Sequence, residues 1–170
     1  MIDETLSNSG SSQIPPATVP MFSGGGGVAV KTINEHYQVI IKKDIDGICS
    51  KYVLSEETYV VLEGPRLTTI GFEKIKKGWT DFCNSSLQLV SIVWVEGPFA
   101  EEQETMAWVA GIIKLKIKVI DENTNHGKEF ENTFRTSFVL VKHEGVLKIK
   151  HEHVSVVHPD PYGIGDWLKK

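Results

Sequence analysis

The sequence predicts an α+β domain in which helices come first and a long curved antiparallel sheet follows. Apolar residues at three- and four-residue steps predict amphipathic helices over 29–43 and 71–84. Strand-type patterns then run from residue 87 to residue 157. One of them, 104–120, is roughly three times the usual strand length and must bend, with Gly111 as the expected bend. We therefore expect the helices to fill the concave face of the sheet.

The remaining elements are short or join these segments. Ile45 and Ile48 indicate a brief helical turn after the first helix, and the β-prone run 58–62 precedes Gly64 and Pro65. We expect a strand over 87–96, a connection at Gly97–Pro98, and strands near 129–142 and 146–157.

Composition excludes several classes of protein. The chain has 170 residues, of which 41% are hydrophobic and 24% are charged, as in a single soluble domain. Its net charge of -4 disfavours nucleic acid as a partner. The longest apolar run is broken by three lysines, which argues against a membrane span. Because no leader is visible and Cys49 and Cys83 resemble isolated thiols, we expect a cytoplasmic protein.

The chain divides into a domain and two terminal segments. Residues 1–27 contain five Ser, five Gly and three Pro, which predicts a flexible tail. Residues 28–157 form the expected domain. Residues 158–170 combine Pro and Gly with large apolar side chains, so we expect an irregular extension that docks on the domain or on a partner.

Three short segments resemble a known family. Gly71-Phe72-Glu73-Lys74-Ile75, then Arg135-x-Ser137-x-Val139, then Gly145-x-Leu147-Lys148-Ile149-x-His151-x-His153-x-Ser155 resemble the SnoaL-like branch of the nuclear-transport-factor-2-like superfamily. The last segment is also similar to the association domain of calcium/calmodulin-dependent kinase. Leu147 departs from the family's usual aromatic residue, and Ser137 from its frequent Thr.

The resemblance implies a cone-shaped curved antiparallel sheet wrapped around the N-terminal helices, also described as a cystatin-like roll. It further implies a pocket in the open end of the cone and, commonly, a dimer through the outer sheet face. The superfamily contains ketosteroid isomerase, cyclases, dehydratases and many non-catalytic modules, so the fold does not define a reaction.

The register of the last hairpin decides which side chains share the pocket. Because Glu144 resists positive φ, we expect a three-residue loop with only Gly145 left-handed. Counting outward places five residues at the mouth of the cone: Arg135, Ser137, His151, His153 and Ser155. The opposite face, with Phe134, Phe138 and Val154, then forms a subunit interface.

Each candidate residue has a structural alternative. Arg135 either recognises an anion or carbonyl or satisfies polar neighbours. His151 and His153 are framework groups or half of a metal site, but no third ligand is evident and no metal is expected. Tyr37 and Trp79 are included as ligand-binding residues because their helices face the same cavity, although both are typical core residues.

These placements leave three functions open. The inner faces expected for the last three strands carry no Asp or Glu, which favours a non-catalytic module that oligomerises and binds a small carboxylate or carbonyl compound between Arg135 and His153. An isomerase, cyclase or dehydratase with His153 as base is the alternative. A structural subunit recruited through its tails is the third possibility. We expect no cofactor, and a homodimer or higher homo-oligomer.

Overall fold

The helices and the longer strands of the protein follow one another in the order that the sequence predicts, and a short strand at Thr69–Ile70 that was not predicted lies among them. A computed structural model describes residues 27–62, 67–120 and 127–157, so both terminal segments lie outside the described residues except for Gly27. The helices are α1 (Val28–Ile41), α2 (Ile45–Ser50) and α3 (Phe72–Cys83). The strands are β1 (Tyr59–Val61), β2 (Thr69–Ile70), β3 (Leu87–Glu102), β4 (Met106–Ile120), β5 (Gly127–His143) and β6 (Val146–Val156).

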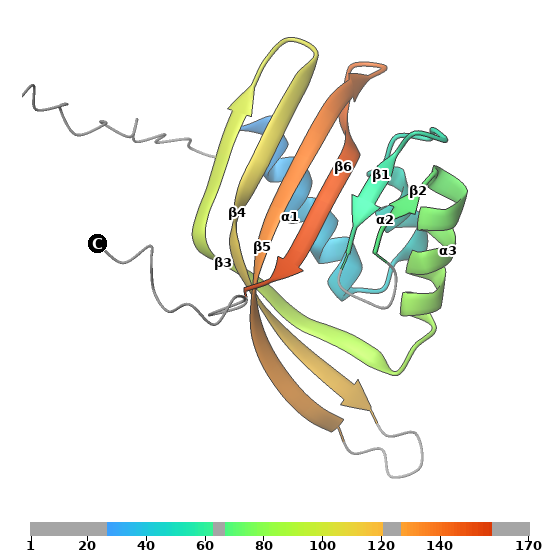
Figure 1. Cartoon of the computed structure of the whole chain (residues 1–170), viewed down its shortest axis with the longest axis vertical. Helices are drawn as coiled ribbons and strands as arrows, with labels where there is room; N and C mark the ends of the chain where they lie inside the picture. Colours follow the sequence, from blue (N-terminus) through green and yellow to red (C-terminus); the bar gives the residue numbers. More distant parts are fainter. Residues whose placement is uncertain (1–26, 63–66, 121–126, 158–170) are drawn as a thin grey trace, which may run out of the picture.

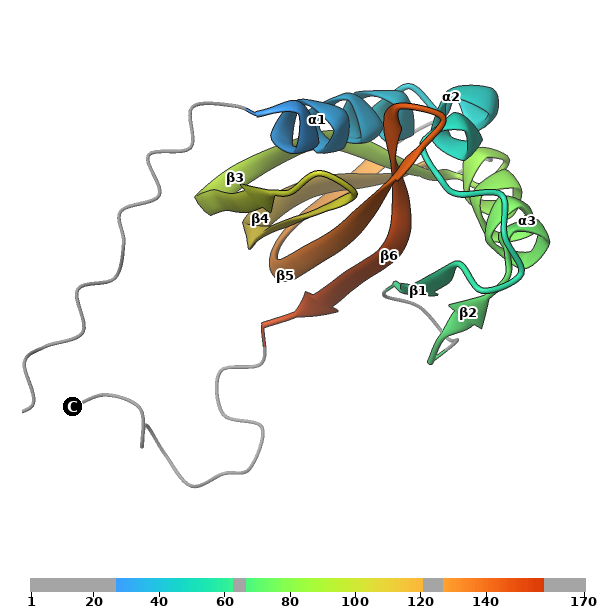
Figure 2. The same ribbon diagram turned by 90° about the horizontal axis from the view of Figure 1, so that it is seen from above.

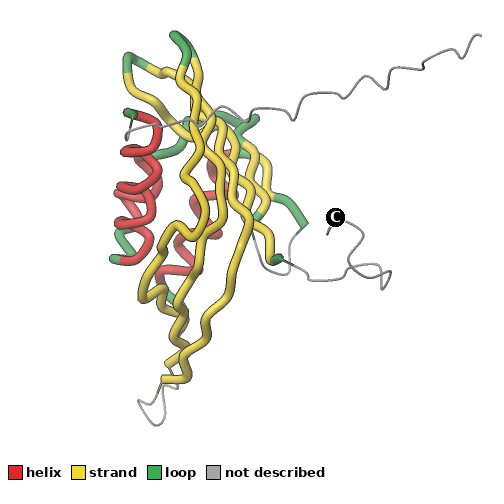
Figure 3. Tube along the Cα trace, turned by 90° about the vertical axis from the view of Figure 1, so that its left-hand side faces the viewer, coloured by secondary structure: helices red, strands yellow, loops and turns green. Residues whose placement is uncertain are grey.

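A single curved sheet organises the described part of the chain. Its strand order is β2-β1-β6-β5-β4-β3. β1 runs parallel to β6, and the other neighbouring pairs are antiparallel. The three helices lie on one side of the sheet, inside its curve (Figures 1, 2 and 3). The predicted α+β cone is confirmed in this arrangement.

The helices are held against the sheet by apolar faces and by polar contacts at their ends. In α1, the buried side chains Ala29, Ile33, Tyr37 and Ile40 recur at the expected spacing. The amide of Ala29 donates to Glu102 Oε1 over 2.7 Å, which places a carboxylate from β3 at the positive end of the helix dipole. This contact joins the start of the helix layer to the far edge of the sheet.

The predicted connection at Gly97–Pro98 was wrong, because β3 continues through these residues to Glu102. The pairing with β4 shifts between Glu96 and Phe99, so an irregularity accommodates the proline that lacks an amide hydrogen. Gly111 lies opposite this irregularity, where a Cβ atom would come within 2.5 Å of the Glu96 carbonyl oxygen. Glycine therefore permits the close approach of the two strands at this bend.

The turn between β5 and β6 also differs from the expected loop. His143 pairs with Val146, which leaves a two-residue turn of Glu144 and Gly145 with φ of 52° and 81°. Both residues adopt the left-handed conformation that a mirror-image turn requires. Glu144 thus adopts the strained conformation that the sequence argument excluded. As a result, β5 pairs with β6 one residue away from the expected register.

A β-bulge in β6 moves the register a second time. Leu140 pairs with Ile149, whereas Val139 pairs with His151, so Lys150 is the extra residue. The inward face of β6 therefore changes from the odd-numbered Leu147 and Ile149 to the even-numbered Glu152. This bulge decides which side chains of β6 face the interior of the cone.

No helix in the described part of the chain is long and apolar enough to cross a membrane.

Candidate functional site

A cavity of about 530 Å³ lies inside the cone, between α3 and the inner face of the sheet. Its volume is within the usual range for small-molecule sites. Buried apolar side chains form most of its deep part: Ile40, Val60, Ile75, Trp79, Ile113, Leu115 and Phe134. Exposed residues lie at its mouth, namely Thr68, Lys74, Gly78 and Asp81. The cavity is therefore an apolar chamber with a polar entrance.

One carboxyl group interrupts the apolar interior. Glu152 lines the cavity and is only 2% exposed. It comes from the part of β6 that follows the bulge, where the even-numbered side chains point inward. Lys74 and Asp81, the other charged residues among the described lining, are exposed at the mouth. Glu152 is thus the charged group available to a molecule that enters the deep part of the cavity.

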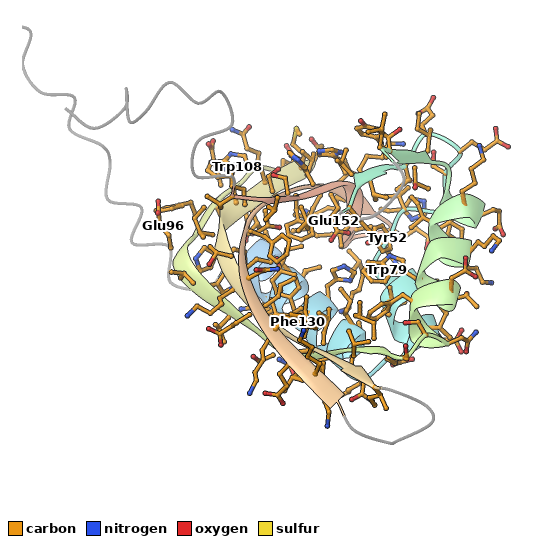
Figure 4. The ribbon with its side chains drawn as sticks, turned by 60° about the horizontal axis from the view of Figure 1, so that its bottom comes forward. Tyr52, Trp79, Glu96, Trp108, Phe130 and Glu152 are labelled. Atoms are coloured by element: carbon orange, nitrogen blue, oxygen red, sulfur yellow. The ribbon has the colours of Figure 1, made fainter. Side chains whose placement is uncertain are left out.

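A chain of hydrogen bonds from two other elements ends at Glu152. Trp79 Nε1 of α3 donates to the Tyr52 hydroxyl oxygen over 3.0 Å, and Tyr52 in turn donates to Glu152 Oε2. Indole nitrogen can only donate, so the direction of the chain is fixed. Figure 4 shows Tyr52, Trp79 and Glu152 turned toward one another inside the cone. Glu152 Oε2 is therefore the acceptor at the end of this chain.

The Tyr52 hydroxyl remains protonated in this position. Burial raises the pKa of Tyr52 well above its usual range, and the adjacent Glu152 carboxyl raises it further. Burial likewise raises the pKa of Tyr37, whose hydroxyl lies 3.3 Å from Thr136 Oγ1. Tyr52 therefore acts as a permanent donor to Glu152 at neutral pH.

His36 of α1 completes the polar cluster. Its Nε2 lies 3.6 Å from Glu152 Oε2 and 3.5 Å from the Tyr52 hydroxyl, while its buried Nδ1 has no hydrogen-bond partner among the described residues. One edge of the ring therefore faces the Tyr52–Glu152 pair, and the other lies against the apolar core.

The predicted inner face of β5 was the wrong face. Phe134, Thr136, Phe138 and Leu140 are buried toward the helices, whereas Arg135 is exposed on the outer face of the sheet. Phe134 lines the cavity and Phe138 is 1% exposed, so neither is available as the predicted subunit interface. The cause is the two-residue turn, which shifts β5 by one position relative to the expected register.

The predicted inner face of β6 was wrong beyond the bulge. His151, His153 and Ser155 alternate with the inward Glu152 and Val154 and so lie on the outer face. His151 Nδ1 donates to the Tyr59 carbonyl over 3.0 Å, and its ring stacks on that of Tyr59. Val154, expected at the interface, lines the cavity. His151 therefore has a framework role at the junction of β6 and β1.

The outer-face placement separates Arg135, Ser137, His151, His153 and Ser155 from the cavity lining. The predicted joint action of Arg135 and His153 inside the cone is wrong for that reason. Tyr37 and Trp79, by contrast, line the cavity as their helices suggested. Their contact with a ligand remains a prediction.

Sequence reasoning missed three residues of the cluster: His36, Tyr52 and Glu152. A signal existed for His36, because it interrupts the apolar stripe of α1 between Ile33 and Tyr37. Glu152 carried no such signal, since simple alternation from Ile149 places it outside. The described residues contain no group of three or more His, Cys, Asp or Glu side chains that would hold a metal ion.

The fold and the cavity define the class of protein. A curved sheet wrapped around helices, with an apolar cavity inside its curve, is the architecture also found in nuclear-transport-factor-2-like structures. The family model for the SnoaL-like domain matches residues 30–159, and the chain belongs to this family. A search of curated proteins found no match.

Solved structures of low sequence identity share the fold. A nuclear transport factor 2-like superfamily protein from Salmonella enterica has a TM-score of 0.61 and 18% identity, over 80% of this chain and 93% of that one. A ketosteroid isomerase-like protein from Erwinia carotovora has a TM-score of 0.61 and 14% identity, over 78% and 95%. A putative calcium/calmodulin-dependent protein kinase II association domain from Xanthomonas campestris has a TM-score of 0.58 and 15% identity, over 79% and 91%.

Proposed function

We propose that the protein is a ligand-binding module whose cavity holds a small, mostly apolar molecule with one polar group placed against Glu152. The observation that carries the proposal is the buried Glu152 carboxyl at the deep end of an otherwise apolar cavity of about 530 Å³. Apolar walls supply affinity through burial, and a single polar group fixes orientation. The predicted carboxylate ligand loses its support, because Arg135 is outside and Glu152 repels an anion.

Blocking the mouth of the cavity tests this proposal. Gly78 lines the cavity on α3, and a Cβ atom built there meets nothing within 4 Å. Gly78→Leu should therefore fill the entrance without a clash and abolish binding of N-phenylnaphthylamine, a neutral apolar probe whose fluorescence rises in apolar sites. Replacing a helical glycine should also raise stability by about 1 kcal/mol.

Gly78→Ala is the matched control, because it has the same gain in helix propensity and leaves the entrance open. It should bind the probe as the wild type does, in the same fluorescence titration. Equal binding by Gly78→Leu, or no binding by the wild type, would contradict the proposal.

Proton-transfer catalysis is a second candidate, and Glu152 is the observation that favours it. The sequence argument for a non-catalytic module relied on the absence of an inner carboxylate, and Glu152 removes that argument. The expected base, His153, lies on the outer face, so a reaction of the isomerase type would use Glu152 instead.

Exchange of the α-protons of a ketone for deuterium tests proton-transfer catalysis directly. In deuterated buffer, the wild type should accelerate loss of the α-proton NMR signal of tetralone, and Glu152→Gln should return the rate to that of buffer. Equal rates for wild type and buffer would exclude this chemistry on a simple ketone and leave the binding module as the function.

We also propose that the domain forms a homodimer through the outer sheet face, with different residues from those expected. Phe99, Met106 and Trp108 are 41%, 46% and 36% exposed on this face. Met106 pairs with Val141 and Trp108 with Val139, so apolar side chains continue across three strands. An exposed apolar area with a central Trp is typical of a subunit interface.

A further inference from the structure

The donors around Glu152 satisfy only one of its two oxygens. Oε2 accepts from Tyr52, whereas Oε1 forms no hydrogen bond with any described residue although Glu152 lines the cavity. A buried carboxylate oxygen accepts hydrogen bonds and cannot donate them. The polar group of a bound molecule must therefore bring a hydrogen-bond donor to this position.

Positive charge is scarce around the free oxygen of Glu152. Lys74 is the cation among the described lining residues, and it is exposed at the mouth. His36 Nε2 lies 3.6 Å from Oε2, the oxygen that Tyr52 already contacts. A positively charged donor on the ligand would therefore be bound more tightly at Oε1 than a neutral donor, because a charge-assisted hydrogen bond is the stronger one.

Aromatic side chains lie around the same part of the cavity. Trp79, Phe82, Phe134 and Tyr37 all contribute to its lining. Aromatic faces attract cations through their quadrupole, and they also accept an apolar skeleton. A carboxylate among aromatic rings thus offers two independent attractions to a cation carried on a hydrocarbon body.

We propose that the ligand of this cavity is a hydrophobic amine, bound as an ammonium ion with its N–H groups directed at Glu152 Oε1. The inference rests on the proposed binding function and names its ligand class. The ammonium ion supplies both the missing donor to Oε1 and a positive charge that strengthens the hydrogen bond. A neutral alcohol supplies only the donor, and a carboxylate supplies neither.

Three probes with one skeleton separate these possibilities: naphthylmethylamine, naphthylmethanol and naphthoate. Isothermal titration at neutral pH should show the amine binding at least about tenfold more tightly than the alcohol, because the hydrogen bond is charge-assisted. Naphthoate should show no measurable binding. The comparison uses unaltered protein and does not depend on how any variant folds.

Glu152→Gln tests which residue recognises the charge. The amide keeps the size of the side chain and an acceptor oxygen but removes the negative charge, so the affinities for amine and alcohol should become equal within about threefold. Glu101→Gln, on the outer sheet face, is the matched control and should keep the wild-type preference.

The outcomes distinguish the proposed amine ligand from the more general proposal that the cavity binds a small molecule. If the alcohol binds the wild type as tightly as the amine, or if Glu152→Gln keeps the amine preference, the amine inference is overturned and the binding function stands. If neither the amine nor the alcohol binds, and N-phenylnaphthylamine does not bind either, both are overturned together.

Discussion

At the scale of single residues, Tyr52 connects three elements through one hydroxyl group. It accepts a hydrogen bond from Trp79 of α3 and donates one to Glu152 of β6, while lying directly after α2. Tyr52 is 1% exposed, so water cannot replace either bond. The hydroxyl therefore contributes to folding as well as to the polarity of the cavity.

Tyr52→Phe should lower the free energy of unfolding by about 1–3 kcal/mol, because it leaves the Trp79 N–H group and a Glu152 oxygen without their partner. Urea denaturation followed by tryptophan fluorescence measures the change. Tyr59→Phe is the control, since the Tyr59 hydroxyl forms no hydrogen bond with a described residue. If Tyr52→Phe lowers the free energy of unfolding no more than Tyr59→Phe does, the Tyr52 hydroxyl has no structural role.

The cluster shows why site residues were harder to predict than the fold. His36 interrupts an apolar helix stripe, which is a readable signal for a buried polar group. Glu152 has no local signal, since its burial depends on Lys150 being extra in the strand pairing. Such an insertion is decided by how β6 fits between β1 and β5, which the sequence of β6 alone does not encode.

At the scale of elements, the periodic patterns located the helices and most strands closely. Helices expected over 29–43 and 71–84 are found at Val28–Ile41 and Phe72–Cys83, because their apolar stripes pack on the sheet as assumed. The end of β3 was misplaced, because Gly97 and Pro98 lie within a strand irregularity. Glycine and proline mark both bulges and turns, so composition alone does not distinguish them.

The β5–β6 hairpin shows how one turn affects many side chains. Glu144 has a φ of 52°, an unfavourable conformation for this residue, and the two-residue turn that results exchanges the faces of β5. Phe134 and Phe138 consequently enter the core, and Arg135 leaves it. The alternation expected for β5 was correct, but the assignment of its two faces was not.

At the scale of the whole molecule, the two sheet faces have different roles. The inner face encloses the cavity, whereas the outer face presents Phe99, Met106 and Trp108 to solvent. Farther along β4 and β5 on the same outer face, Lys114 forms an ion pair with Glu131 at 3.2 Å, and Lys116 forms one with Glu129 at 2.8 Å. The proposed interface is therefore the apolar part of the outer face, around Trp108.

Trp108→Lys should convert the proposed dimer to a monomer. The substitution removes the central aromatic side chain and introduces a charge that can pair with Glu101 in the monomer, so the fold should persist. Light scattering with size-exclusion chromatography should report half the wild-type mass. Val146→Lys, at the exposed hairpin turn, carries the same charge change and should leave the mass unaltered; a monomeric wild type would contradict the interface.

The bulge at Lys150 has a consequence for how such a cavity can change over evolution. One inserted residue decides whether β6 presents Glu152 or its histidine neighbours to the interior. Regular pairing of the same residues, with Lys150 taken into the ladder, would bring His151 and His153 inward and turn the carboxylate outward, while the walls supplied by other elements would keep their shape. Deletion of Lys150 would instead leave Glu152 inward, because His151 would then follow Ile149 directly. An acidic binding site and an imidazole-lined one thus differ by the pairing of one strand, and new chemistry can arise in this cone without replacement of a side chain in β6.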